Sequence, residues 1–134
     1  MVDDLRLRLE AEVQRLAEVR SAIRAWLSSQ QVERPEDVVL AVDEAVANAI
    51  EHSGRFRAEP VFIDVVARID GRSIRVEVTD EGSWRPPHDD ESRGRGLNII
   101  GALMDDVQVA RTTSGTSVTM YRSLSRLAER PSRP

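Results

Sequence analysis

The sequence contains neither cysteine nor lysine, and these two absences exclude several classes of protein. Without cysteine the chain has no disulfide framework, no thiol nucleophile and no zinc site built on thiolates. All 19 basic residues are arginine, which we interpret as a compositional habit of the source. A P-loop NTPase and a protein kinase of the usual eukaryotic pattern both place a lysine at the phosphates, so both are excluded.

Long apolar runs and an excess of positive charge are also missing. The longest apolar stretches are far shorter than the ~20 residues that a membrane-spanning helix needs, and residues 1–4 lack the pattern of a secretion signal. A net charge of −4 argues against a direct nucleic-acid surface. With 134 residues, we expect one cytoplasmic domain that contacts neither membrane nor nucleic acid.

Hydrophobic periodicity predicts the element order β-α-α-β-β-α-β-β. The expected strands lie at 5–9, 61–69, 74–78, 107–109 and 116–120, and the expected helices at roughly 11–28, 35–53 and 97–104. This order predicts an α+β fold, a two-layer sandwich in which helices cover one face of a mixed, mostly antiparallel sheet. We expect the domain to span residues 1–122 and residues 123–134 to be a tail or linker remnant.

Glu44 and Asn48 lie four residues apart in the second predicted helix, so their side chains project from the same side. An amide oxygen suits a hard cation that bridges phosphates. A carboxylate one turn away can deprotonate or orient an attacking hydroxyl. The pair also fits an ordinary solvated helix face, because Asp37, Asp43 and Glu51 lie nearby.

Asp80 continues the core-facing side of its strand, where an acid is unfavourable unless it is paired. The exocyclic amine of a purine is one suitable partner, and Gly82 lets the chain pass close to a flat base. The alternative is a turn aspartate that bonds its own backbone.

Two further segments carry features of a ligand site: one suits a phosphate, and the other directs a hydroxyl toward the interior. Gly94-Arg95-Gly96 precedes a predicted helix, where free backbone N–H groups can hold phosphates. Thr116 shares a face with Val118 and Met120, so its hydroxyl is directed inward. An ordinary loop-to-helix junction and a common strand threonine explain these features equally well when each is taken alone.

Taken in order, these segments resemble the GHKL (Bergerat-fold) ATPase superfamily. Within it they are most similar to the anti-sigma-factor serine/threonine kinases of the RsbW and SpoIIAB type. The motifs that carry the resemblance are VDEAVANAIEHS (42–53), VEVTDEG (76–82), GRGLNIIGALMDDV (94–107) and SGTSV (114–118).

The resemblance implies an ATP- and Mg²⁺-dependent kinase with Glu44 as catalytic base, Asn48 as magnesium ligand and Asp80 as acceptor of the adenine amine. The remaining nucleotide-site residues that it implies are Gly82, Gly94, Arg95, Gly96, Leu97 and Thr116. Such proteins phosphorylate a serine on a small anti-anti-sigma (STAS-type) protein and otherwise hold a sigma factor inactive. The resemblance also implies a homodimer and a partner-binding role for Arg20.

Three other hypotheses about the function stay open at this point. Trp84 takes the place of a second glycine usual after Asp80, which favours a non-catalytic module that binds ATP or ADP and holds partners without phosphoryl transfer. A catalytic domain of a histidine kinase is disfavoured, because no long helical hairpin with a phosphoacceptor histidine is present. A scaffold that binds no nucleotide would need all four motifs to coincide by chance.

Overall fold

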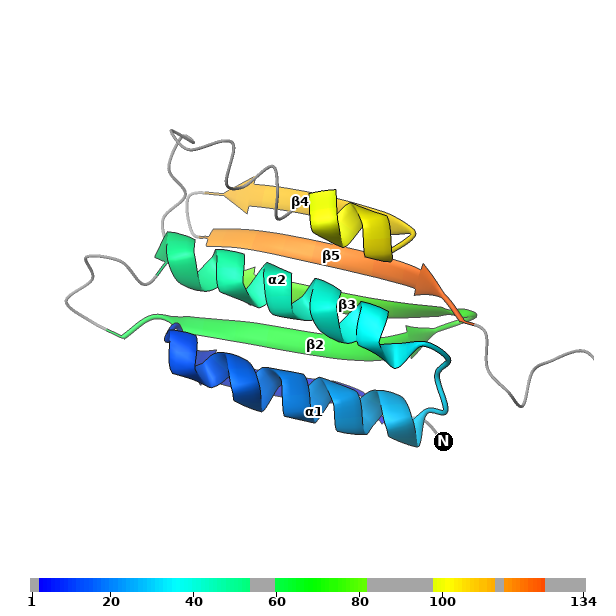
Figure 1. Ribbon diagram of the computed structural model, residues 1–134. Coiled ribbons are helices and arrows are strands. Elements are labelled where there is room, and N and C mark those ends of the chain that lie inside the picture. Colours follow the sequence, from blue (N-terminus) through cyan, green and yellow to red (C-terminus); the bar gives the residue numbers. More distant parts are fainter. Residues whose placement is uncertain (1–2, 54–59, 82–97, 113–114, 125–134) are drawn as a thin grey trace, which may run out of the picture.

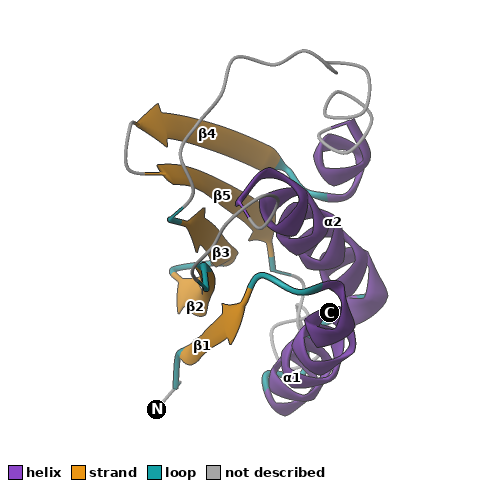
Figure 2. Cartoon of the chain, turned by 90° about the vertical axis from the view of Figure 1, so that its left-hand side faces the viewer, coloured by secondary structure: helices purple, strands orange, loops and turns teal. Residues whose placement is uncertain are grey.

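The computed structural model of the chain describes residues 3–53, 60–81, 98–112 and 115–124. It shows two layers, with the strands forming one sheet and the helices lying over one of its faces (Figures 1 and 2). The elements are β1 (Leu5–Glu10), a 3₁₀ turn η1 (Val13–Arg15), α1 (Leu16–Ser29), α2 (Pro35–Ser53), β2 (Phe62–Asp70), β3 (Ser73–Asp80), β4 (Asp106–Thr112) and β5 (Gly115–Ser123). A short helix is also described over residues 98–103.

The sheet has five strands in the order β1-β2-β3-β5-β4. The predicted α+β sandwich is therefore confirmed, and each pairing between the described strands is antiparallel rather than mixed. Because β5 lies between β3 and β4 and is antiparallel to both, β3 and β4 run in the same direction. Their C-terminal ends consequently meet at the same edge of the sheet, and this edge positions the site described below.

The β2–β3 hairpin follows directly from its sequence pattern. Alternate residues face the helices and are buried, among them Ile63 and Val65 on β2 and Val76 and Val78 on β3. The turn between the strands contains Gly71, whose φ of 64° lies in the left-handed region that glycine adopts without a steric penalty.

Both long helices bury one apolar stripe against the sheet. In α1 the buried residues are Val19, Ile23, Trp26 and Leu27, and in α2 they include Val38, Val39, Val42, Val46 and Ile50. The first helix was predicted from residue 11, whereas the structure has the η1 turn first and begins α1 at Leu16. Among the described helices, none is both long and apolar enough to cross a membrane.

Two ion pairs join α1 to α2. Arg20 Nη1 lies 2.9 Å from Asp43 Oδ1, and Arg24 donates two hydrogen bonds of 2.7 and 2.9 Å to the Glu36 carboxylate. The Arg24 guanidinium lowers the pKa of Glu36 below its ordinary value. Exposed ion pairs of this kind contribute about 1 kcal/mol or less, so the apolar stripes hold the helices on the sheet.

Candidate functional site

A cleft lies between the C-terminal half of α2 and the sheet edge where β3 and β4 end. The space between its walls, counted together with the part open to solvent, is about 460 Å³. From α2 it is lined by Ala45, Asn48, Ala49 and His52, and from the sheet by Val78, Asp80, Val109, Arg111, Thr116 and Val118. The helical wall and the sheet floor therefore each combine small or apolar residues with polar ones.

The helical wall of the cleft is built on one side of α2. Ala45 and Asn48 are three residues apart and Ala49 and His52 repeat that spacing, so all four project from neighbouring positions of the helix surface. The two alanines are buried and their side chains stop at Cβ. Their small size keeps this part of the α2 surface free of bulky side chains.

The floor of the cleft contains a polar row that crosses three strands. Asp80 on β3 is the Cα partner of Thr116 on β5, and Thr116 is the Cα partner of Arg111 on β4. Asp80 is only 5% exposed. The row lies one step beyond apolar Val78 and Val118, which are themselves paired across the same two strands. The cleft therefore has an apolar inner part and a charged outer part.

Gly115 holds the Asp80 end of this row in place. A Cβ atom on Gly115 would overlap the carbonyl oxygen of Asp80 and would lie 3.1 Å from its carbonyl carbon. It would also lie 3.3 Å from the Cα of Glu81. The backbones of β3 and β5 approach this closely only because residue 115 has no side chain, which explains the glycine before Thr116.

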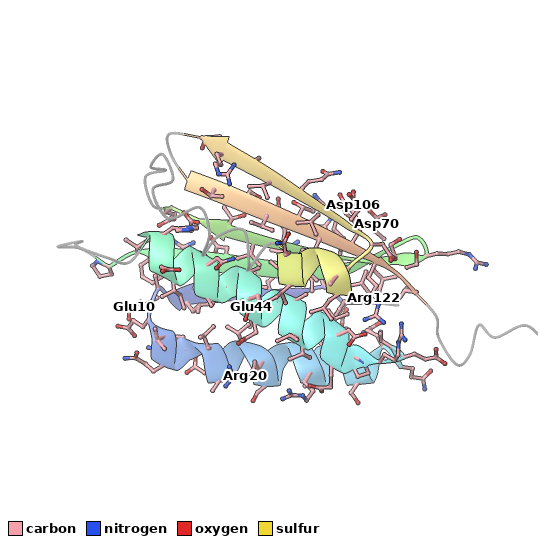
Figure 3. The ribbon with its side chains drawn as sticks, turned by 45° about the horizontal axis from the view of Figure 1, so that its top comes forward. Glu10, Arg20, Glu44, Asp70, Asp106 and Arg122 are labelled. Atoms are coloured by element: carbon pink, nitrogen blue, oxygen red, sulfur yellow. The ribbon has the colours of Figure 1, made fainter. Side chains whose placement is uncertain are left out.

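The structure brings Asn48, Asp80 and Thr116 together around one cleft, although they come from three separate sequence motifs. Glu44 lies one helical turn before Asn48, is partly buried, and is not among the residues that line the cleft. Arg20 lies on α1, outside the cleft, and Figure 3 shows it and Glu44 on neighbouring helices. The predicted site residues Gly82, Gly94, Arg95, Gly96 and Leu97 lie outside the described residues.

Two polar residues of the cleft, His52 and Arg111, were not predicted to belong to it. His52 follows Asn48 by four residues, so helical spacing alone places the two on one side of α2. Arg111 continues the alternation of Val107 and Val109, just as Asp80 continues that of its own strand. The periodicity was therefore sufficient to find both residues once the strand order was known.

Among the residues that the structure describes, no group of three or more histidine, cysteine or acidic side chains is arranged to hold a metal ion. The amide oxygen of Asn48 remains a suitable single ligand for Mg²⁺, which keeps several waters and takes its other ligands from phosphates.

With this geometry established, comparison with known proteins identifies the family. The Histidine kinase-like ATPase domain family matches residues 9–122, and the chain belongs to this family. The serine-protein kinase RsbW of Staphylococcus epidermidis is 28% identical, over 90% of this chain and 86% of that protein. The anti-sigma F factor of Clostridium acetobutylicum is also 28% identical, over 89% of this chain and 91% of that protein.

Solved structures agree on the fold. The crystal structure of the RsbU and RsbW domains of Rv1364c from Mycobacterium tuberculosis superposes with a TM-score of 0.74 and 26% identity, over 98% of this chain. This chain spans only 34% of that longer chain. The histidine kinase AdeS of Acinetobacter baumannii, at 16% identity and a TM-score of 0.55, shares the fold alone.

Proposed function

We propose that this chain is an ATP-dependent serine/threonine protein kinase that also acts as an anti-sigma factor. The observation that carries the proposal is that Asn48 and Asp80, from distant motifs, line the same cleft. The names of the relatives, a serine-protein kinase and an anti-sigma F factor, support the same conclusion. In this proposal the cleft binds the nucleotide, and the partner proteins bind on the helical side of the domain.

Asp80 recognises the adenine in this proposal. Its carboxylate accepts a hydrogen bond from the exocyclic amine, and its burial makes that bond strong because little water competes for it. In this proposal Val78 and Val118 on the floor pack against one face of the ring, and Ala49 on the helix covers only the inner part of the other face. The Thr116 hydroxyl, adjacent to Asp80 across the strands, hydrogen-bonds the same edge of the base.

Asn48 lies on the helical wall of the cleft, and in this proposal the phosphates extend from the base toward it. Its amide oxygen would hold a Mg²⁺ ion, which when bound neutralises charge on the phosphates. Gly94, Arg95, Gly96 and Leu97 complete the phosphate site in this proposal, and Gly82 passes beside the base. Arg95 adds a positive charge to the triphosphate.

Glu44 is the proposed base. Its carboxylate takes the proton from the hydroxyl of a serine on the partner protein. The serine oxygen then forms a bond to the γ-phosphorus while the bond from that phosphorus to the β–γ bridging oxygen breaks, and ADP leaves. Glu44 lies one turn before Asn48 and directly before Ala45, which lines the cleft, and this position suits a group that meets the partner's serine rather than the nucleotide.

The partners in this proposal are an anti-anti-sigma protein of the STAS type, which is phosphorylated, and a sigma factor, which is sequestered. Arg20 contributes to their binding surface. It is 41% exposed although it pairs with Asp43, and Asp43 directly precedes Glu44 in α2. A partner that contacts Arg20 is thereby placed beside the proposed base. We also propose that the chain acts in the cytoplasm as a homodimer.

Single-turnover transfer of labelled phosphate from ATP to the partner tests the proposal. Glu44→Gln should reduce the transfer rate by at least about 100-fold, the usual contribution of a general base, and leave ATP affinity largely unchanged. Asn48→Ala should lose both properties. Glu51→Gln, the same exchange at an exposed position of α2, serves as the control and should behave as wild type.

Two outcomes would contradict the proposal. Transfer by Glu44→Gln at the wild-type rate would show that another group is the base. ATP binding by the wild-type protein without any labelled partner would identify a regulatory module that holds its partners without phosphorylating them.

A further inference from the structure

Arg111 is a charged residue of the cleft that the proposed chemistry leaves without a role. It lies on the edge strand β4 and lines the cleft together with Val109. Val107, Val109 and Arg111 occupy alternate positions of β4 and so share the face directed at the helices. The apolar pattern of this strand therefore ends in a guanidinium at the sheet edge where β3 ends in a carboxylate.

Cross-strand register fixes where Arg111 lies in the sheet relative to the base-binding end of the cleft. Asp80 pairs with Thr116 and Thr116 pairs with Arg111, so the three residues form a straight row. Two strand spacings separate the ends of the row, roughly 10 Å between the Cα atoms of Asp80 and Arg111. An arginine side chain can span much of that distance, over the position of Thr116.

We propose that Arg111 stacks its guanidinium plane on the nucleobase and forms the outer wall of the base-binding end of the cleft. This inference rests on the proposed function, because it requires a nucleotide whose base lies beside Asp80. An arginine suits this role since its guanidinium is planar and stacks on aromatic rings, whereas a lysine ammonium is a compact point charge.

The location of Arg111 assigns it to the base rather than to the phosphates. It shares its row with Asp80 and Thr116, which face the amine edge of the base in the proposed function. Asn48, the proposed ligand at the phosphates, lies on the opposite wall of the cleft, on α2. Val109, two residues before Arg111 on the same side of β4, extends the apolar surface against which the ring would lie.

Stacking and hydrogen bonding make different predictions about selectivity. Asp80 distinguishes bases, because it needs an amine at the edge of the ring. Arg111 contacts the ring face, which every purine presents. Loss of the Arg111 side chain should therefore weaken the binding of adenine and hypoxanthine nucleotides by the same factor, and the preference between them should stay unchanged.

Binding titrations of Arg111→Ala with ATP, ADP, adenosine and inorganic tripolyphosphate test the assignment. We expect ATP, ADP and adenosine to bind roughly 3- to 30-fold more weakly than to wild type, the range of a guanidinium stacked on a ring. Tripolyphosphate should bind to Arg111→Ala and to wild type with equal affinity. Arg111→Lys keeps the positive charge but lacks the planar guanidinium, so this variant should still bind adenosine more weakly than wild type does.

Arg6→Ala is the matched control. Arg6 lies on the opposite edge strand β1, its side chain is 65% exposed, and its nearest acid is 3.6 Å away, so its removal should change no nucleotide affinity. An equal melting temperature for Arg111→Ala and wild type shows that the cleft is intact, and the lysine variant gives a second measurement if the alanine variant is less stable.

The outcomes separate this inference from the proposed function. If wild type binds no adenine nucleotide, the proposed function fails. If wild type binds ATP and Arg111→Ala binds adenosine with unchanged affinity, only the stacking role is overturned. If Arg111→Ala binds ATP and tripolyphosphate more weakly but adenosine with unchanged affinity, Arg111 lies at the phosphates. If Arg111→Lys binds adenosine as tightly as wild type does, charge alone matters. Either result overturns the inference.

Discussion

Asp80→Asn tests how the cleft recognises its ligand. The exchange keeps the shape of the side chain, so it opens no cavity at a position that is only 5% exposed. It replaces a charged acceptor with a neutral amide. A hydrogen bond to a charged group contributes about 1.5–3 kcal/mol, and a tenfold change in affinity corresponds to about 1.4 kcal/mol. We therefore expect ATP to bind about 10- to 150-fold more weakly to Asp80→Asn.

Isothermal titration with ATP and with ITP measures this effect. ITP carries a carbonyl oxygen where ATP carries the amine, so the wild-type carboxylate should repel it. The asparagine amide of the variant can donate a hydrogen bond to that oxygen, and ITP should bind more tightly to Asp80→Asn than to wild type. The variant thus reverses or removes the preference for ATP, an effect that general damage to the cleft does not produce.

Asp70→Asn provides the control for this experiment. Asp70 is exposed at the turn end of the same hairpin. It pairs with Ser73, the first residue of β3, whereas Asp80 is the last residue of that strand. Its exchange should leave both affinities unchanged. Unchanged ATP affinity in Asp80→Asn, or an equal loss for ATP and ITP, would refute the assignment of Asp80 to the amine.

Two further predictions concern the supports of the site. Gly115→Ala should lower the free energy of unfolding by about 1–3 kcal/mol, as overpacking does, and should weaken ATP binding, because a Cβ there meets the backbone of Asp80. Gly101→Ala, where a Cβ meets nothing within 4 Å, is the control and should be neutral or stabilising in the same denaturation assay. Equal stability of the two variants would contradict the close-approach argument. Arg20→Ala should weaken partner binding in a pull-down or titration with the partner and leave ATP affinity intact. Arg24→Ala, which loses the neighbouring ion pair, should change neither partner binding nor ATP affinity. Loss of ATP affinity in Arg20→Ala would contradict the separation of the partner-binding surface from the nucleotide cleft.

Much of the fold could be predicted from the sequence because its patterns are local. Helix α2 was predicted with both ends correct, since Pro35 fits the first turn of a helix and the apolar stripe continues to Ile50. The β2–β3 hairpin followed from strict alternation and a glycine turn. The beginning of α1 was placed too early, because the apolar pattern does not distinguish the η1 turn from the helix that follows it.

Part of the lining of the cleft could also be predicted from local patterns. Asp80 was recognised because an acid at a core-facing strand position needs a partner. Arg111 follows the same rule on β4, but its position beside Asp80 depends on β5 lying between β3 and β4. Strand order is a long-range property that periodicity does not contain. His52 was not assigned to the site, because the end of a helix also suits a histidine for electrostatic reasons.

Thermal unfolding with saturating nucleotide tests the central claim most directly, namely that the cleft between α2 and the sheet binds an adenine nucleotide with Mg²⁺. At ligand concentrations of 100 times Kd, stabilisation is about 2.7 kcal/mol, which raises the melting temperature of a domain this size by roughly 10 °C. We predict such a shift with Mg-ATP and Mg-ADP, a much smaller one with Mg-GTP, and a reduced one when ATP is added with EDTA. Equal shifts with ATP and GTP, or no shift with either, would contradict the claim.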